Sequence, residues 1–240
     1  MRPAVALTVA AHDPLGGAGF AADLTTFAAL GVHGACAVTA VTAQRLASVD
    51  RVAAVDIDLV DAQLDGIVAD LDPAGLKTGL LGSAAVVDSI ARRVAGGELP
   101  APVVDPVLVD GRGRRFVDED IERAYRERLF PAARVLTPNL AEAGLLVGRQ
   151  LATVDDLISA ADALADLGAA YVVVTGGGLG GDLAVDVVVA ADGSVDLLAG
   201  TRFDTTNVRG SGCTFAAAVT ARLALGDDAL AAIHHAKEFV

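Results

Sequence analysis

Apolar runs of strand length alternate with amphipathic helical stretches along most of this chain. A run at 5–10 and another at 35–41 flank a stretch of helical spacing at 19–30, which is the order strand, helix, strand. The same reading places further strands at 75–78, 103–107, 135–137 and 171–175, and further helices at 59–71, 84–95, 118–129, 140–147, 154–167 and 215–225. The near-continuous valine runs are typical of parallel strands that helices cover on both faces.

The last third of the chain has a different pattern. Two apolar runs at 184–190 and 195–199 flank Ala191-Asp192-Gly193-Ser194, a turn-rich tetrapeptide typical of a hairpin. We therefore predict one α/β domain over 1–240, with a mostly parallel central sheet, helices on both faces and an antiparallel edge. In open sheets of this kind ligands bind at the carboxyl ends of the strands, so candidate chemistry is sought there.

Composition narrows the classes of function. The chain has 240 residues, 53% of them hydrophobic, which is enough for one extensive core. Its net charge of −13 argues against nucleic-acid or acidic-membrane partners, which are bound by clustered Lys and Arg. Cys36 and Cys213 form no CxxC pattern, so neither a disulfide framework nor a zinc site is indicated.

The N-terminus and the longest uncharged segment bear on the location of the protein. The N-terminus has no signal-peptide pattern, and a cytoplasmic location is the expectation. The segment 24–44 lacks charged residues and is long enough to span a bilayer. Because glycines, threonines, a histidine and a glutamine interrupt it, we interpret it as a buried helix followed by a buried strand.

The most informative segment for chemistry is Gly210-Ser211-Gly212-Cys213, just before the helical pattern at 215–225. Glycines that open a helix leave backbone N–H groups free to hold an anion, and the helix dipole favours negative charge there. Cys213 would then stand beside a transferred group, an arrangement that suits phosphoryl transfer. Taken alone, the segment is also compatible with an ordinary glycine-capped helix and a buried cysteine.

A second glycine-rich segment follows the first predicted strand. Residues 13–19 hold three glycines, which allow the backbone to approach a ligand closely, and Asp23 lies one turn into the next helix. A tight strand-to-helix turn is an equal alternative. Gln44 ends the next predicted strand, where its amide can pair with a ring nitrogen and an amino group of a heterocycle.

Asn139 and Glu142 lie three residues apart at the start of a predicted helix, so both can face one water-filled cavity. Magnesium keeps several waters and takes one or two carboxylates, so this sparse pair is chemically sufficient for it. The alternative is structural, because Asn139 can cap the helix with Glu142 as its capping-box partner.

Two other segments are candidates for phosphate binding. Gly176, Gly178 and Gly181 have G-x-G-x-x-G spacing, but the segment leads into a strand, so a dinucleotide site is rejected on context. A phosphate-lining loop or a plain hairpin loop remains. Three arginines form the basic cluster of an acidic chain, and they either hold a substrate phosphate or belong to a solvated loop: Arg112, Arg114 and Arg115.

Together these motifs resemble one family, hydroxymethylpyrimidine/phosphomethylpyrimidine kinase of thiamin biosynthesis. They appear in the family's order over almost the whole chain: Asp13-Pro14, Gly16-Gly17-Ala18-Gly19, Ala22-Asp23, Thr42-Ala43-Gln44, Lys77-Thr78-Gly79, Asp105-Pro106-Val107, Thr137-Pro138-Asn139 with Glu142, and Gly210-Ser211-Gly212-Cys213-Thr214. The resemblance implies a ribokinase-like three-layer fold, ATP, Mg²⁺ and a homodimer. It also implies phosphorylation of 4-amino-5-hydroxymethyl-2-methylpyrimidine, its monophosphate, or both.

The resemblance also assigns roles to residues of this chain. It implies that Asp23 and Gln44 contact the aminopyrimidine, in a pocket lined by Gly17, Ala18, Leu80 and Val107. It implies that Asn139 and Glu142 serve the metal and the ATP phosphates, with Thr175 and Gly177 beside the nucleotide. Gly210 to Cys213 would form the anion hole. Cys213 would be the base, and a helix N-terminus would be expected to lower the pKa of its thiol.

Three departures from the family pattern stand out. Thr175 replaces a lysine that the family often has near the ATP phosphates, so either a loop arginine substitutes for it or turnover is slow. His12 stands where threonine is commoner, and the chain stops where family members usually continue. Two rival functions follow: a pyridoxal kinase of the same fold, or a pyrimidine-phosphate binding module that has lost turnover.

Overall fold

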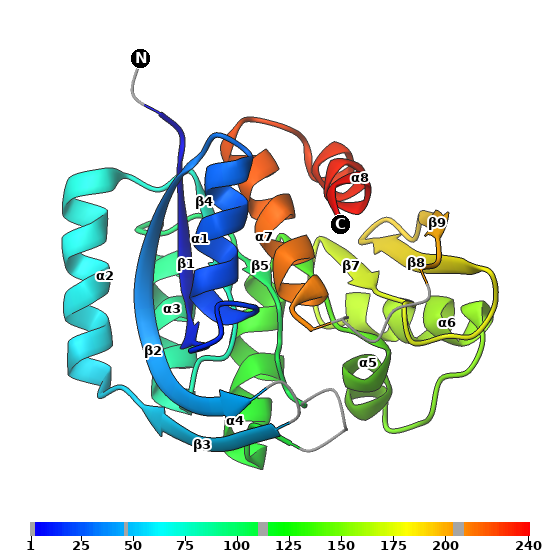
Figure 1. Ribbon diagram of the computed structural model, residues 1–240, viewed down its shortest axis with the longest axis horizontal. Coiled ribbons are helices and arrows are strands. Elements are labelled where there is room, and N and C mark those ends of the chain that lie inside the picture. Colours follow the sequence, from blue (N-terminus) through cyan, green and yellow to red (C-terminus); the bar gives the residue numbers. More distant parts are fainter. Residues whose placement is uncertain (1–2, 46–47, 110–114, 204–208) are drawn as a thin grey trace.

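A computed structural model describes residues 3–45, 48–109, 115–203 and 209–240. One nine-stranded sheet of order β3-β2-β1-β4-β5-β6-β7-β8-β9 runs through the molecule, with helices on both faces (Figure 1). The strands are β1 (Val5–His12), β2 (His33–Arg45), β3 (Ser48–Ala54), β4 (Gly75–Thr78), β5 (Val103–Val104), β6 (Val135–Leu136), β7 (Tyr171–Val174), β8 (Leu183–Ala190) and β9 (Val195–Thr201).

The six central strands, from β2 to β7 in the sheet order, are all parallel to one another. The predicted hairpin is confirmed, because β8 pairs antiparallel with both β7 and β9. At the other edge β3 pairs antiparallel with β2, and the sequence analysis missed this strand. The sheet therefore has an antiparallel pairing at both edges, where one was expected.

Two layers of helices cover the sheet. One contains α1 (Gly19–Ala29), α7 (Ser211–Ala224) and α8 (Ala229–Phe239), and the other contains α2 (Ile57–Leu71), α3 (Ala84–Ala95), α4 (Glu119–Ala124), α5 (Leu140–Val147) and α6 (Val154–Ala165) (Figure 1). The stretch expected as one helix at 118–129 is α4 followed by a π-helical turn at Tyr125–Leu129 and a 3₁₀ turn at Phe130–Ala132. The helix α8 was not predicted.

Neighbouring valines on the central strands belong to different cores. Val103 and Val173 pack in the core under α7 and α8, whereas Val104 and Val172 pack in the larger core on the opposite face. Successive side chains of a strand point to opposite faces, so a run of valines is what a doubly covered strand requires. Fully burying one such side chain contributes roughly 1.5–3 kcal/mol.

The uncharged segment 24–44 divides as expected, into the rest of α1 and most of β2. Within the described ranges, no helix is long and apolar enough to cross a membrane.

Candidate active site

The two glycine-rich segments are in direct contact at the carboxyl edge of the sheet. Gly210 has φ +79°, and a Cβ built on it would lie 1.7 Å from the backbone oxygen of Gly17. Gly19 has φ +59°, and a Cβ there would lie 2.2 Å from the oxygen of Ala11. Only glycine fits such positions, because both the backbone conformation and the space exclude a side chain. The first loop and the turn before α7 therefore form one backbone surface.

This surface carries the N-termini of α1 and α7, whose N-cap residues, Ala18 and Gly210, make no side-chain capping bond. The other six α-helices all begin with a side chain that accepts a backbone N–H: Asp56, Ser83, Asp118, Asn139, Thr153 and Asp228. Uncapped first-turn N–H groups and the positive end of a helix dipole suit an anion.

Gly210→Ala is expected to unfold more easily than the parent protein and to lose most activity. A left-handed backbone at a residue with a Cβ costs roughly 1–2 kcal/mol, and the clash with Gly17 adds to this. The matched control is Gly148→Ala, because Gly148 has φ +70° but open space around it. Urea denaturation should show a larger loss for Gly210→Ala. Equal losses of unfolding free energy would mean that the turn at Gly210 does not pack against the loop at Gly17.

Beneath this surface lies a buried cluster of charges around Lys77. Its ammonium lies 2.9 Å from Asp23 Oδ1 and 3.6 Å from Asp105 Oδ2. The Thr8 hydroxyl donates to Asp23 Oδ2 at 2.6 Å. Burial alone would lower the pKa of Lys77, but the negative charges around it, Asp23 first, raise that pKa above its ordinary value. The contacts of Asp23 are therefore internal, and it is fully buried. Its expected contact with a pyrimidine stays a prediction.

Cys213 lies beside the same cluster, and the expected direction of its pKa shift is wrong. Burial raises the pKa of the thiol, and the nearby charge of Asp105 raises it further. The ammonium of Lys77 and the backbone N–H of Gly19, which hydrogen-bonds to the sulfur, oppose the shift without reversing it. The helix N-terminus is therefore outweighed, and the thiol is protonated near pH 7.

Asp105 and Glu142 are two buried carboxylates that influence each other. Glu142 Oε1 accepts from the N–H of Leu108 at 3.0 Å, and its Oε2 accepts from the N–H of Asn139 at 3.1 Å. Burial and the charge of Asp105 nevertheless raise the pKa of Glu142 to about 8. Asp105 Oδ2 is buried without a hydrogen-bond partner. This pair of oxygen donors fits a divalent cation completed by waters.

Asn139 is used as a helix cap. Its Oδ1 accepts from the N–H groups of Ala141 and Glu142, both at 3.0 Å, and the reciprocal bond from Glu142 completes a capping box. The capping alternative is thus confirmed. The two capping bonds use both lone pairs of Asn139 Oδ1. Asp105 is therefore better suited than Asn139 to hold a cation together with Glu142. In the part of the chain that the structure describes, no three His, Cys, Asp or Glu side chains form a metal cluster.

The two segments expected beside the nucleotide are neighbours. Asn139 and Thr175 form an isolated parallel β-bridge, and the N–H of Thr175 donates to the oxygen of Pro138 at 3.1 Å. Gly177 follows in the loop between β7 and β8, and its oxygen accepts from Arg202 at 2.7 Å. This loop leads into the strand β8, as the sequence analysis predicted.

The remaining residues expected at the pyrimidine pocket lie at the carboxyl ends of β2, β4 and β5 or just beyond them. Gln44 is half-buried one residue before the end of β2, opposite Val49 of β3. Leu80 follows β4 and is buried. Val107 follows β5 and has φ +38°, a conformation that a β-branched residue rarely adopts and that is often found at functional sites.

Of the basic cluster, Arg115 pairs with Glu122 of α4, while Arg112 and Arg114 lie outside the described residues. Sequence reasoning gave no site role to Asp105 or Lys77, although both stand in motifs that it quoted. The signal that could have found Asp105 was its place directly after a buried strand, at the edge where ligands bind.

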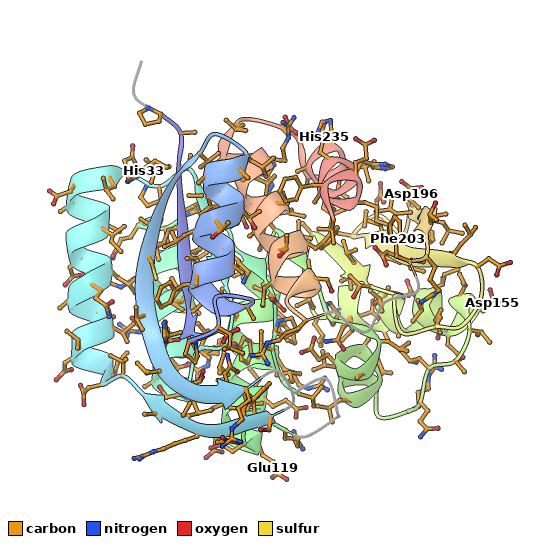
Figure 2. The ribbon with its side chains drawn as sticks, in the orientation of Figure 1. His33, Glu119, Asp155, Asp196, Phe203 and His235 are labelled. Atoms are coloured by element: carbon orange, nitrogen blue, oxygen red, sulfur yellow. The ribbon has the colours of Figure 1, made fainter. Side chains whose placement is uncertain are left out.

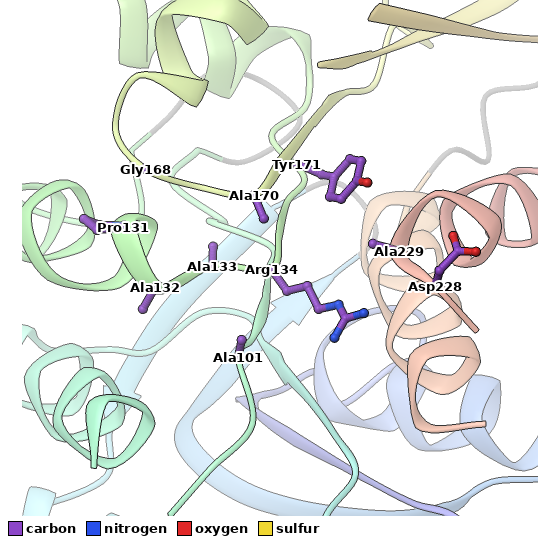
Figure 3. A pocket seen from close by; sticks show the side chains of 10 residues that line it. All are labelled: Ala101, Pro131, Ala132, Ala133, Arg134, Gly168, Ala170, Tyr171, Asp228 and Ala229. Atoms are coloured by element: carbon purple, nitrogen blue, oxygen red, sulfur yellow. The ribbon is translucent and has the colours of Figure 1, made fainter. Parts of the chain in front are cut away.

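Volume alone does not mark this site. A surface hollow of about 530 Å³ lies at the opposite edge of the sheet, where Ala101, Ala133 and Ala170 come just before β5, β6 and β7 (Figure 3). None of the predicted site residues lines it. Its walls are mostly alanine and proline, and its charged side chains are Arg134 and Asp228.

Known kinases are similar to this chain over most or all of its length. A family model described as phosphomethylpyrimidine kinase matches residues 13–240. A hydroxymethylpyrimidine/phosphomethylpyrimidine kinase of Synechococcus elongatus is 42% identical over 100% of this chain and 91% of its own length. The ADP complex of Bacillus subtilis pyridoxal kinase is 40% identical, with a TM-score of 0.92 over 100% of this chain and 91% of that one.

Staphylococcus aureus pyridoxal kinase in complex with AMP-PCP and pyridoxal is 32% identical, with a TM-score of 0.90 over 99% of this chain and 86% of that one. The similar proteins thus divide between two kinase activities at comparable identity. The two solved structures share the fold of this chain. With its expected ribokinase-like fold confirmed, the chain belongs to the phosphomethylpyrimidine kinase family.

Proposed function

We propose that this protein transfers the γ-phosphoryl group of ATP to 4-amino-5-hydroxymethyl-2-methylpyrimidine, to its monophosphate, or to both, in thiamin biosynthesis. The observation that carries the proposal is the meeting of two helix N-termini without a side-chain N-cap, those of α1 and α7, beside the buried carboxylates Asp105 and Glu142. Phosphoryl transfer needs mainly positioning and stabilisation of negative charge, and this arrangement offers both.

ATP is the proposed donor because two similar kinases have been solved with ADP and with AMP-PCP bound. Asp105 and Glu142 would hold Mg²⁺, which would neutralise charge on the phosphates. Since the pKa of Glu142 is raised to about 8, metal binding would compete with a proton at neutral pH. Magnesium affinity is thus expected to increase as the pH rises toward 8.

The chain's own groups have separate tasks in this proposal. The first-turn N–H groups of α7 hold the transferred phosphoryl, and Gln44 contacts the aminopyrimidine. Cys213 accepts the proton of the substrate hydroxyl. Its raised pKa makes the thiolate a strong base but keeps that thiolate scarce near pH 7. Asp23 has an indirect role, because its carboxylate pairs with Lys77 and holds that side chain in place.

Gln44→Ala is expected to weaken pyrimidine affinity by about 1–3 kcal/mol, the cost of leaving a polar partner unpaired. Isothermal titration calorimetry with the pyrimidine measures this. The control is ADP affinity of the same variant, which is expected to stay unchanged because Gln44 lies on β2, away from the β7 loop. Unchanged pyrimidine affinity would move the pocket elsewhere.

Pyridoxal kinase is the second candidate, because two of the similar structures are of pyridoxal kinases. A competition experiment separates the candidates: equal concentrations of the monophosphate, the free pyrimidine and pyridoxal are incubated with magnesium-ATP, and products are identified by mass spectrometry. Phosphorylated pyrimidine as the main product supports the proposal, whereas pyridoxal phosphate contradicts it. Saturable binding without any product selects the binding module.

The assembly and location belong to the same proposal. A homodimer of single-domain chains is the state that the resemblance implies, and sedimentation equilibrium tests it. A cytoplasmic location, without nucleic-acid or membrane partners, accords with the net charge of −13.

A further inference from the structure

Arg202 carries a charge that no described carboxylate neutralises. Its Nη1 donates to the oxygen of Gly177 at 2.7 Å and its Nη2 to the oxygen of Leu183 at 3.2 Å. Its Nε is buried and has no hydrogen-bond partner among the described residues. Within the described ranges, no Asp or Glu oxygen lies within 4.0 Å of this guanidinium.

Other partly buried arginines of this protein behave differently. Arg93 pairs with Asp61 and Asp65, and Arg222 pairs with Asp227. Removing a cation from water without a counter-charge is costly, and two carbonyl oxygens compensate for only part of this cost. In a chain of net charge −13, the carboxylates to pair Arg202 are plentiful. The unneutralised charge and the unused Nε donor of Arg202 are therefore suited to an anionic group of a ligand.

The topology places Arg202 at the edge of the sheet that holds the candidate site. Since β8 is antiparallel to both β7 and β9, the strands β7 and β9 end at the same edge. Arg202 directly follows β9, and its bond to Gly177 ties it to the loop that follows β7. Figure 2 labels the next residue, Phe203, near the β8–β9 pair.

The loop that Arg202 contacts has five glycines and no lysine or arginine between Thr175 and Gly181. Such a loop allows phosphates to approach its backbone but supplies no charge of its own. A guanidinium is well suited to supply the missing positive charge, because its planar N–H donors bind two phosphate oxygens at once.

The position also indicates which phosphates are bound. The acceptor pocket is proposed at β1 and β2, and β9 lies six strands beyond β1 in the sheet order. At about 4.8 Å per strand this is roughly 30 Å, beyond the reach of one side chain. Arg202 therefore lies on the side of the nucleotide away from the acceptor, where the α- and β-phosphates of ATP extend from the anion hole.

We propose that Arg202 is the cation that binds the α- and β-phosphates of the nucleotide. The proposal rests on the proposed kinase function, because it takes ATP as the donor. In this proposal the glycine loop after β7 and Arg202 together bind the phosphates of nucleoside di- and triphosphates.

The test is calorimetric titration with two ligands, ADP and adenosine. Arg202→Gln is expected to raise the Kd of ADP by about ten-fold or more, as for loss of a charged hydrogen bond, and to leave the Kd of adenosine within about two-fold. Arg202→Lys keeps the charge without the planar fork and should recover part of the ADP affinity. In turnover, the KM of ATP should rise while the KM of the acceptor stays the same.

Arg134→Gln is the matched control, since Arg134 is an exposed arginine at the opposite edge of the sheet, beside the hollow of Figure 3. It should bind both ligands like the parent protein. An unchanged ADP affinity in Arg202→Gln would overturn the proposal, and so would equal losses for ADP and adenosine, which indicate a collapsed loop. If Arg202→Gln does not fold, the same two titrations with Arg202→Lys decide.

The proposed function and this inference can be contradicted separately. If the parent protein binds ADP but phosphorylates neither a pyrimidine nor pyridoxal, the kinase proposal is contradicted, while the ADP affinities of the variants still report on Arg202. If the parent protein binds no ADP at all, the inference is overturned.

Discussion

Cys213→Ala is expected to lower turnover of 4-amino-5-hydroxymethyl-2-methylpyrimidine by about 100-fold or more, the range for loss of a general base. Turnover of the monophosphate should fall much less. A hydroxyl must lose its proton during the transfer, whereas a phosphate monoester has a second pKa near 6 and already carries a nucleophilic oxygen at pH 7 to 8. The two acceptors therefore separate proton transfer from the other contributions of the anion hole.

The measurement is the initial rate of ADP release at saturating magnesium-ATP with each acceptor. Cys36→Ala is the matched control, because Cys36 is the chain's other cysteine and lies in β2, paired in register with Thr8 of β1. It should change neither rate by more than about two-fold. Parent-like turnover of the hydroxymethyl compound by Cys213→Ala would remove this thiol from the chemistry. An equal loss with both acceptors would assign Cys213 to positioning alone.

Lys77→Met is expected to lower the free energy of unfolding by about 3–5 kcal/mol, because it leaves two buried carboxylates without their cation. Methionine fills most of the volume of the lysine chain, so the loss reports on charge more than on a cavity. Asp23 is fully buried and Asp105 is 5% exposed, and neither can regain water without opening the core. Activity should fall as well, since the same cluster lies under Cys213.

Urea denaturation measures the loss, with Arg149→Met as the control. Arg149 pairs with Asp156 at 2.6 Å on the surface, and such pairs contribute up to about 1 kcal/mol. Adding Asp23→Asn to Lys77→Met should recover part of the loss by removing one unpaired charge. A loss below about 1 kcal/mol for Lys77→Met would contradict the account of the cluster.

The loss should also depend on pH. Burial raises the pKa of Asp23, and the ammonium of Lys77 opposes that rise. Without the ammonium, the folded-state pKa of Asp23 moves further above its unfolded value. A group of this kind contributes stability at low pH and loses it as pH rises through its folded-state pKa. The deficit of Lys77→Met should therefore be smaller at pH 5 than at pH 8.

The central strands could be predicted because each carries apolar residues on both faces. Edge strand β3 could not be found in this way, because five of its seven residues are exposed, including Asp50 and Arg51. The helix α8 was predictable, since its buried residues have helical spacing: Ala229, Ala232, Ile233 and Ala236. Helix starts and turns were mostly predictable because they depend on local chemistry, as at Gly210 and Asn139.

The electrostatics of the site could not be predicted from local sequence. Lys77, Asp23 and Asp105 come from β4, α1 and the end of β5, and only the folded sheet brings them together. The direction of the Cys213 pKa shift depends on these neighbours, so a forecast based on the helix N-terminus alone was wrong. The contact of Arg202 with the loop after β7 could not be predicted for the same reason, because 25 residues of chain separate Arg202 from Gly177.

The most direct test of the account is ADP release by the parent protein with magnesium-ATP, with and without the pyrimidine monophosphate or the free pyrimidine. The account predicts ADP release that depends on the pyrimidine and yields one phosphorylated pyrimidine per ADP. Saturable pyrimidine binding with no pyrimidine-dependent ADP release, or release that only pyridoxal stimulates, would contradict it.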